Sequence, residues 1–442
     1  MPQFAHHAPD AVVPTQHEPP IAGVVLRHDW PLSPRYVQRA QAAQVSHWLQ
    51  AHGLDIRWLD VQPCVDGWRY RLTREAWHAL TPDYSTLDTV HRLQDRPCTR
   101  ELEIALALLA SPVEHVFPSF DELCAHVDAR KNTCAAGERT TLAFATESAE
   151  RPTQHWTYAE DTGFTLRPQA ELIEALTLAT QPSVSGELFS FSCYRATEYV
   201  LLLGLAQTLK NFNPSLLKQL EHTWRIKAIA SGRFHDAFLT EVGSLEQPLP
   251  MHYYVPGDRV WFRNPDEASA DVVGFEGSWV VYLGQGRFTD FWRPQSHYTL
   301  EHKCLEIYYW REAVLAATAA TAEPQLDETI VWAKMAALQA GLDAGNAAAH
   351  AERERILQRM MRYRDGRGVY AEGGCIDATR EHLRWVCPEH TRIDLPALPH
   401  EAALTRQTRP QSQPYAWLPT ETSTDAATLL QQFTPSASML PI

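Results

Sequence analysis

The chain has 442 residues, of which 45% are hydrophobic and 21% are charged, so it can form two or three globular domains. Its formal net charge of -14 and the lack of a Lys and Arg stripe argue against a binder of nucleic acid or anionic membranes, because contacts to phosphate need clustered cations. Eight irregularly spaced cysteines do not form a secreted disulfide framework, and no apolar run suits a signal peptide or membrane helix. We expect a cytoplasmic protein, or one exported by a route without a classical signal peptide.

Composition divides the chain into five stretches. Pro and His dominate residues 1–21, which predicts a flexible N-terminal arm, and Pro, Ser, Thr and Gln dominate residues 395–442, which predicts an extended tail. Between them we expect a small α+β unit over 22–97, a catalytic core over 98–312 and a helical extension over 313–394, whose main helix covers 326–362.

In the α+β unit, the hydrophobic periodicity predicts one helix and three strands around a turn at Asp66-Gly67. Two helices follow, and the second has Ser119 as N-cap and Glu122 three residues later, which is a capping box. The predicted strands are 23–26, 56–61, 68–72, 142–145, 156–158 and 164–166. The predicted helices are 33–52, 99–109, 119–134, 169–179, 214–224 and 228–234.

The stretch 186–195 is extended and aromatic, and it runs straight into an apolar helix that reaches Leu209. Cys193 lies at this junction. Its sulfur should approach the unpaired N–H groups of the helix, where the positive end of the helix dipole favours the thiolate. Cysteine nucleophiles are commonly presented in this way. The alternative is that Cys193 packs as a small buried hydrophobic residue.

Residues 251–312 contain turn residues at spacings typical of an antiparallel meander. The predicted strands are 253–255, 259–263, 278–283, 287–292 and 305–311. A helix with a cysteine at its N-terminus, followed by an antiparallel sheet, is the order found in papain-like cysteine enzymes. The expected fold class is therefore α+β, with a papain-like core.

Several short motifs in this region carry a family resemblance. They are SFDEL at 119–123, RKN at 130–132, FAT at 144–146, GFTL at 163–166, LFSFSC at 188–193, PGDRVWFRNPD at 256–266, FEG at 275–277 and VVYLG at 280–284. In this order and spacing, residues 117–311 resemble the small transglutaminases of spore-forming bacteria, the protein-glutamine gamma-glutamyltransferases of the spore coat. The resemblance implies a transglutaminase-like fold, no cofactor, and a glutamine-derived thioester on Cys193.

The chain departs from this family at three positions beside the nucleophile. Ser192 stands where the family has a glutamate before its cysteine, and Ser278 stands where the family has the glutamate of Gly-Glu-Asn. Phe291 matches the family's later histidine. The cysteine is kept and its obvious partners are not, so either other groups replace them or the site is inactive.

The candidate replacements are Glu276 and Asp290, as a general base or as orienting carboxylates. If the 284–286 loop spans three residues, strand pairing puts Glu276, Ser278 and Asp290 on one face of the hairpin. The alternatives are a solvated strand end for Glu276 and a hydrogen-bonding structural aspartate for Asp290. His252, His297 and His302 are further sources of an imidazole.

Aromatic residues near these carboxylates are predicted to line a substrate tunnel, or else to be core residues at alternate strand positions. The substrate-binding candidates are Trp279, Phe291 and Trp292. Cys375, His382, Cys387 and His390 are zinc-ligand types, but they lack paired spacing, so we expect no metal and a short helix over 377–386 instead.

These features favour cysteine-dependent acyl transfer from a protein glutamine, to lysine as cross-linking or to water as deamidation. The partner would be a protein with glutamine side chains, and with lysine side chains in the cross-linking route. A second reading is a cysteine amidase or peptidase delivered into other cells as a toxin. A third is a catalytically inactive structural or interaction protein with the same fold. The sequence does not define the oligomeric state.

Overall fold

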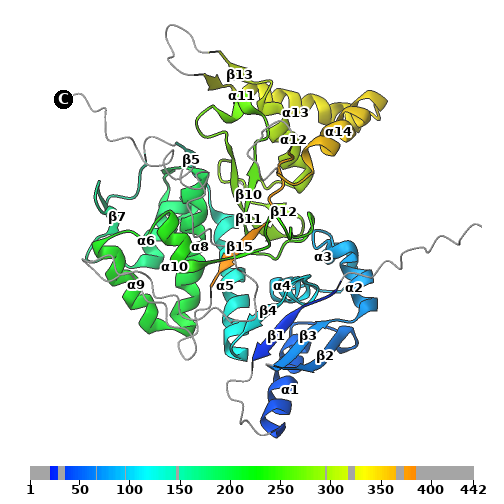
Figure 1. The fold of residues 1–442 in the computed structure, drawn as a ribbon. Helices are drawn as coiled ribbons and strands as arrows, with labels where there is room; N and C mark the ends of the chain where they lie inside the picture. The colour runs from blue at the N-terminus through cyan, green and yellow to red at the C-terminus, as the bar shows by residue number, and fades with distance from the viewer. Residues whose placement is uncertain are drawn as a thin grey trace, which may run out of the picture.

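The computed structural model describes residues 20–27, 35–65, 67–94, 96–145, 149–293, 296–316, 324–364 and 373–384. The expected tail, and nearly all of the expected N-terminal arm, lie outside these residues. Helices and short strands are mixed along the chain, and two long helices, α5 (Phe120–Arg139) and α8 (Cys193–Phe212), pack side by side at its centre (Figure 1). Within the described residues no helix is long and apolar enough to cross a membrane.

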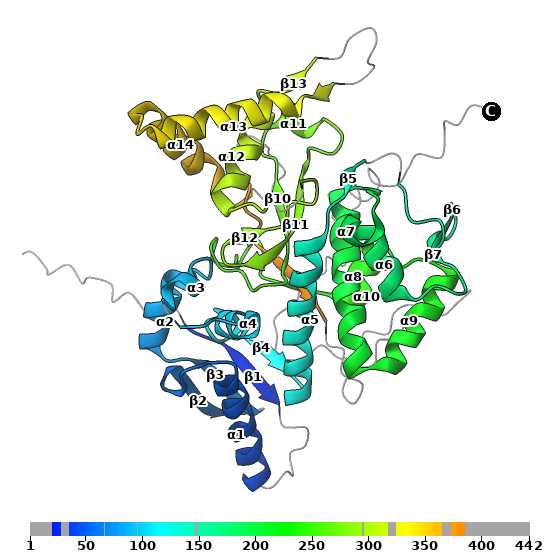
Figure 2. The ribbon, with the colours of Figure 1, turned by 180° about the vertical axis from the view of Figure 1, so that it is seen from behind.

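The N-terminal unit is a four-stranded sheet in the order β2-β3-β1-β4, with helices packed around it (Figure 2). Its strands are β1 (Val24–Arg27), β2 (Leu59–Cys64), β3 (Gly67–Leu72) and β4 (His115–Phe117). Its helices are α1 (Arg35–Ala51), α2 (Arg74–Leu80), α3 (Thr89–Arg92) and α4 (Arg100–Leu109), with 3-10 turns at Ile56–Trp58 and Pro82–Tyr84. The predicted strands and the two predicted helices of this region are confirmed within a few residues.

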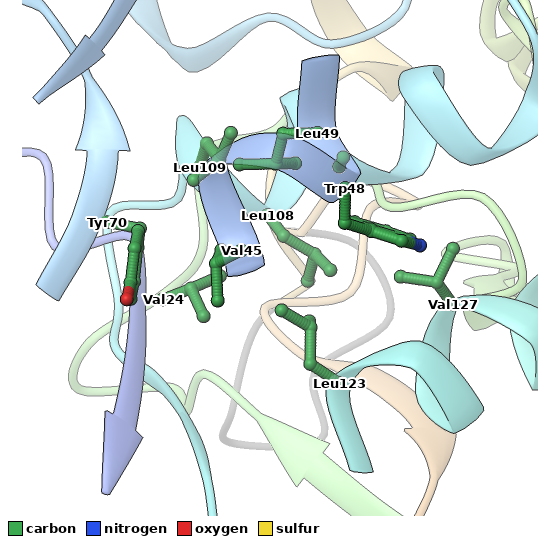
Figure 3. Close-up of a pocket in the computed structure, with 10 residues that line it drawn as sticks. Val24, Val45, Trp48, Leu49, Tyr70, Leu108, Leu109, Leu123 and Val127 are labelled. Atoms are coloured by element: carbon green, nitrogen blue, oxygen red, sulfur yellow. The ribbon is translucent and has the colours of Figure 1, made fainter. Parts of the chain in front are cut away.

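The N-terminal unit shares its apolar core with α5 (Phe120–Arg139), the first helix of the adjoining region. Val45 of α1, Tyr70 of β3 and Leu123 of α5 face the same small cavity of about 10 Å³ (Figure 3). Glu122 donates its backbone N–H to Ser119 Oγ at 3.1 Å, so Ser119 caps α5 as predicted. The unit and the core are therefore joined by a continuous hydrophobic contact.

The helix that carries the predicted nucleophile is α8 (Cys193–Phe212), and it packs along α5 (Figures 1 and 2). The two helices approach closely at Gly204, where an added Cβ would lie 2.7 Å from the Thr133 backbone nitrogen. The surrounding elements are α6 (Leu172–Thr180), α7 (Pro182–Ser185), α9 (Pro214–Ile226) and α10 (Gly232–Phe238), with the strand pairs β5 (Ala143–Phe144) with β8 (Ser190–Phe191) and β6 (Trp156–Ala159) with β7 (Gly163–Leu166).

A five-stranded sheet in the order β12-β11-β10-β15-β9 lies against α5 and α8. Its strands are β9 (Leu239–Val242), β10 (Arg259–Arg263), β11 (Gly277–Gly284), β12 (Arg287–Phe288) and β15 (Arg380–Leu383), and the short helix α11 (Glu267–Ala270) follows β10. Strand β15 comes from the end of the predicted helical extension and pairs with both β10 and β9. The stretch expected as a helix over 377–386 is thus not helical in its described part, where residues 380–383 form β15.

The prediction of a strand over 305–311 is wrong, because these residues belong almost entirely to helix α12 (Leu300–Trp310). Thr299 caps α12 by accepting the backbone N–H of His302 at 3.2 Å. Residues on every side of the helix are buried, so its sequence lacks the polar face that reveals helical periodicity. Residues 253–255 do not form a strand, and the strand predicted over 287–292 ends at Phe288.

The remaining elements complete the C-terminal region. They are β13 (Val314–Leu315), β14 (Gln325–Leu326), α13 (Glu328–Asp343) and α14 (Ala347–Met360). The single helix predicted over 326–362 is divided at Gly345, which has a φ of +67° that interrupts a helix. The last described stretch then returns to the core, where Cys375 and Cys304 of α12 are fully buried with their sulfurs 3.3 Å apart.

Candidate active site

Cys193 is the first residue of α8, at the position that the sequence predicted. Ser192 is the N-cap, and its Oγ accepts the backbone N–H of Arg195 at 3.4 Å. The Cys193 side chain is 9% exposed, so it is nearly enclosed but retains some accessible surface. A thiol at this position lies beside the free N–H groups of a 20-residue helix.

The sulfur of Cys193 lies at the edge of strand β11, at a point where the neighbouring strand has ended. Tyr282 pairs with Asp258 on the β10 side, whereas Val281 pairs with Thr289 on the β12 side, so the odd-numbered residues of β11 direct their N–H groups away from β10. Strand β12 ends at Phe288, which leaves Trp279 without a strand partner on that side. The Trp279 N–H donates to the Cys193 sulfur instead.

Burial is the largest influence on the Cys193 thiol, and it raises the pKa. The nearby Glu276 carboxylate raises the pKa further, while the backbone N–H groups of Trp279 and Tyr194 and the Lys303 ammonium lower it. The net pKa is raised. The expected preference for a thiolate at the helix N-terminus is therefore outweighed by desolvation, and Cys193 is a protonated thiol at neutral pH.

Glu276 lies immediately before β11 and is half-buried. Its Oε1 accepts the backbone N–H of Gly274 at 3.2 Å. Burial raises the pKa of Glu276, which favours the protonated carboxylic acid. Of the two carboxylates predicted for the site, Glu276 is the one whose charge acts on the Cys193 thiol.

Lys303 of α12 is a charged neighbour that the sequence analysis missed. Its side chain is 3% exposed, and its Nζ lies 2.7 Å from Glu306 Oε2 and 3.6 Å from the centre of the Tyr298 ring. Its positive charge lowers the pKa of the Cys193 thiol. The sequence did contain a sign of this helix, because Thr299 is a suitable N-cap and Lys303 and Glu306 have the i, i+3 spacing of a helical ion pair. The prediction of a strand over 305–311 did not take it into account.

Arg259 of β10 holds the aromatic residues that flank the thiol. It is 1% exposed, and its guanidinium lies 4.1 Å from the ring centre of Trp279 and 4.3 Å from that of Tyr194. Its Nε donates to Thr197 Oγ1 at 2.9 Å, and its Nη1 donates to Glu381 Oε2 at 3.0 Å. Strand β15 therefore supplies a counter-ion that positions the surroundings of Cys193.

Comparisons with known proteins identify the family of the chain. The family model of the protein-glutamine gamma-glutamyltransferases matches residues 85–381, which is more than half of the chain. The chain belongs to this family. A transglutaminase from Geobacillus stearothermophilus, without its C-terminal extension, is 18% identical with a TM-score of 0.33, over 48% of this chain and 97% of that one. No curated protein matches the sequence.

Membership of the transglutaminase family confirms the predicted resemblance and the α+β transglutaminase-like fold. It supports protein-glutamine acyl transfer in general and implies protein substrates. The family match also extends beyond the predicted core of 98–312 on both sides. Its end at residue 381 coincides with β15, the strand that carries Glu381 into the core sheet.

Both carboxylate oxygens of Asp290, the second predicted carboxylate, accept hydrogen bonds from residues that follow it in the chain. Its oxygens accept the backbone N–H of Trp292 and the Nε of Arg293, each at 3.0 Å. The hairpin loop has two residues, Gln285 and Gly286, but a bulge in β11 restores the pairing that a three-residue loop would give, with Tyr282 opposite Phe288. The role of Asp290 in catalysis stays a prediction.

The three predicted substrate-binding aromatic residues lie in different surroundings. Trp279 stacks on Trp261 with ring centres 5.9 Å apart. Trp292 is half-buried and lies 5.0 Å from the ring of Phe144, which is 37% exposed. Phe291 is 2% exposed and packs in the main hydrophobic core. Trp279 and Trp292 are therefore partly accessible, and Phe291 is a core residue in this arrangement.

Burial lowers the pKa of the three candidate histidines, His252, His297 and His302. Their neutral forms are favoured. Among the zinc-ligand types, Cys375 contacts Cys304, whereas Cys387 and His390 lie outside the described residues. Within the part of the chain that the structure describes, no group of three or more potential ligands is arranged to hold a metal ion.

Proposed function

We propose that this transglutaminase-family protein forms a thioester between Cys193 and the side chain of a protein glutamine. The proposal is carried by the groups that act together on the Cys193 sulfur. They are the N-terminus of α8, the backbone N–H of Trp279, and the charged side chains of Glu276 and Lys303. Backbone N–H groups at such a position can stabilise both a thiolate and a developing oxyanion. Two oppositely charged side chains beside the sulfur can move protons.

In the first half of the reaction, the Cys193 thiolate attacks the carboxamide carbon of glutamine and a C–S bond forms. The C–N bond breaks, and protonated Glu276 supplies the proton with which the nitrogen leaves as ammonia. The raised pKa of Glu276 suits this acid role. In the second half, an amine or water attacks the thioester carbon and gives its proton to the Glu276 carboxylate. The C–S bond then breaks and releases the Cys193 thiolate with which the cycle began.

The acceptor is proposed to be a lysine amine, with water as the competing acceptor. Exclusion of water from the thioester depends on the surrounding apolar walls. Phe144 and Trp292 contact each other at the surface, and Phe275 lies 6.3 Å from Phe144 and directly precedes Glu276. We propose that this aromatic surface covers the thioester once a protein substrate is bound.

The test is incorporation of a fluorescent primary amine into a glutamine-containing protein, with ammonia release measured in parallel. Cys193→Ala should abolish both signals and leave the circular dichroism spectrum unchanged. Cys98→Ala is the matched control, because Cys98 is a half-buried thiol outside the site, and it should retain activity. Ammonia release without amine incorporation would assign deamidation. Activity retained by Cys193→Ala would refute the proposal.

A further inference from the structure

A second cavity, of about 450 Å³, lies between the β6–β7 hairpin and helix α8. Aromatic side chains form much of its wall, including Phe164, Phe191, Tyr199 and Trp224, and Arg151 and Arg195 contribute its positive charges. The volume falls within the range of small-molecule and peptide sites. None of these residues takes part in the acyl-transfer chemistry proposed for Cys193.

The cavity and the Cys193 sulfur lie on different faces of α8. Arg195, Glu198 and Leu202 line the cavity and follow the i, i+3, i+7 spacing of a single helix face. Thr197 lies on the other side, where it binds Arg259 of the sheet, and Cys193 precedes Thr197 by four residues on that same face. Ser192 and Tyr194, the sequence neighbours of Cys193, also line the cavity, so the cavity adjoins the first turn of α8 on the side away from the sheet.

Arg151 is a buried cation without a counter-ion. Its side chain is 5% exposed and stacks on Phe191, with the guanidinium carbon 3.3 Å from the ring centre. Its Nη1 donates to the carbonyl oxygens of Glu150 and Ser190, at 2.6 and 3.0 Å, and its side chain also forms a hydrogen bond with Tyr199. No carboxylate in the described part of the chain forms an ion pair with it, although buried guanidinium groups are normally paired.

The other charged side chains around the cavity are either paired or exposed to water. Glu198 is paired with Arg195 and also accepts the backbone N–H of Ser231 at 2.6 Å. Glu160 is exposed, so water screens its charge. The enclosed part of the cavity therefore has a net positive charge, supplied by Arg151, and apolar aromatic walls.

We infer that this cavity binds an organic carboxylate carried on an aromatic or apolar body. The carboxylate would pair with Arg151, and the body would contact the aromatic wall. Two sources carry this chemistry: the C-terminal or side-chain carboxylate of a polypeptide, and a free aromatic acid. In either case the ligand would lie beside the first turn of α8, next to Ser192 and Tyr194, in a binding site that adjoins the reaction centre.

The test is isothermal titration calorimetry of the full chain with two probes that differ only in charge, N-acetylphenylalanine and N-acetylphenylalaninamide. The acid should bind at least about tenfold more tightly than the amide, and Arg151→Gln should remove this preference. Arg167→Gln is the matched control because Arg167 is exposed and outside the cavity, and it should leave the preference intact. Equal affinity for the two probes, or no binding of the acid at millimolar concentration, overturns the inference.

A second variant keeps the test decisive if Arg151→Gln does not fold. Ala230→Phe fills the cavity from its half-buried edge and keeps the buried charge, so it should abolish binding of the acid. Binding that survives in Ala230→Phe overturns the inference. Cys193→Ala should bind the acid normally, which separates this site from the proposed reaction. A capped peptide ending in phenylalanine with a free carboxylate distinguishes the polypeptide source, because it should bind more tightly than the single amino acid.

Discussion

Glu381→Gln should destabilise the protein most at mildly acidic pH. Glu381 Oε1 lies 3.2 Å from His235 Nε2, and burial lowers the pKa of His235, but the carboxylates of Asp236 and Glu381 outweigh burial and raise it to about 9. Relative to an unfolded pKa of about 6.5, this shift corresponds to at most about 3 kcal/mol. The stabilisation is fully present below pH 6.5 and is lost as the pH rises through about 9. The variant should therefore lose the Glu381 contribution to this stabilisation in full below pH 6.5, and the loss of stability should become smaller as the pH rises.

A second part of the Glu381→Gln effect does not depend on His235. Arg259 is 1% exposed and forms its ion pair with Glu381, so a neutral glutamine leaves a buried guanidinium without a counter-ion at every pH. The free energy of unfolding should be measured by urea denaturation at about pH 6 and about pH 10, alongside the NMR titration of the His235 ring. The difference between variant and wild type should be larger at the lower pH.

Asp236→Asn is the matched control for this prediction. Asp236 is 55% exposed and lies 3.7 Å from His235 Nδ1, so solvent screens its charge more than that of Glu381, which is 11% exposed. The control should lower the His235 pKa less than Glu381→Gln does. If Glu381→Gln leaves the His235 titration unchanged, or if its destabilisation is the same at both pH values, the reasoning from the ion pair is wrong.

Two further predictions concern the site and the fold. Glu276→Gln removes the acid proposed to protonate the leaving nitrogen, so amine incorporation should fall about 100-fold, while iodoacetamide should alkylate Cys193 no more slowly than in the wild type, because no carboxylate remains to oppose the thiolate. Slower alkylation would contradict this. Gly204→Ala should lower stability by about 1–3 kcal/mol, measured by urea denaturation, because its Cβ would meet the Thr133 backbone. A glycine-to-alanine change in an exposed helix would instead increase stability, so the sign of the change tests whether α5 and α8 pack closely at Gly204.

Sequence patterns predicted those elements that have a polar face or a clear cap. The Ser119 cap identified the start of α5, and the change from an aromatic strand to an apolar helix located Cys193 at the start of α8. Helix α12 was misassigned because it is buried on all sides, and its aromatic residues have high strand propensity. Strand β15 could not be predicted, because its place in the sheet depends on partners more than a hundred residues earlier.

The site was predicted only where neighbours in sequence are neighbours in space. Glu276 was found because it lies two residues from the family position at Ser278, and its influence on Cys193 is present in the structure. Lys303 and Arg259 reach the candidate site from α12 and β10, and the sequence around them does not predict that they lie near Cys193. The position of Cys193 at a helix N-terminus is visible in the sequence, but the burial that raises the pKa of its thiol is not.

The serines that replace two family glutamates are consistent with a site that must limit negative charge around an enclosed thiol. Each carboxylate near the sulfur opposes thiolate formation, as Glu276 does, and burial already opposes it. With Ser192 serving as the α8 cap and Ser278 on β11, one carboxylate and one ammonium act on the sulfur, so their charges nearly balance. Burial raises the pKa of Glu276, which favours the protonated form that the proposed acid role requires. We therefore propose that Ser192 and Ser278 are compatible with acyl transfer, and amine incorporation that is lost in Cys193→Ala would support this.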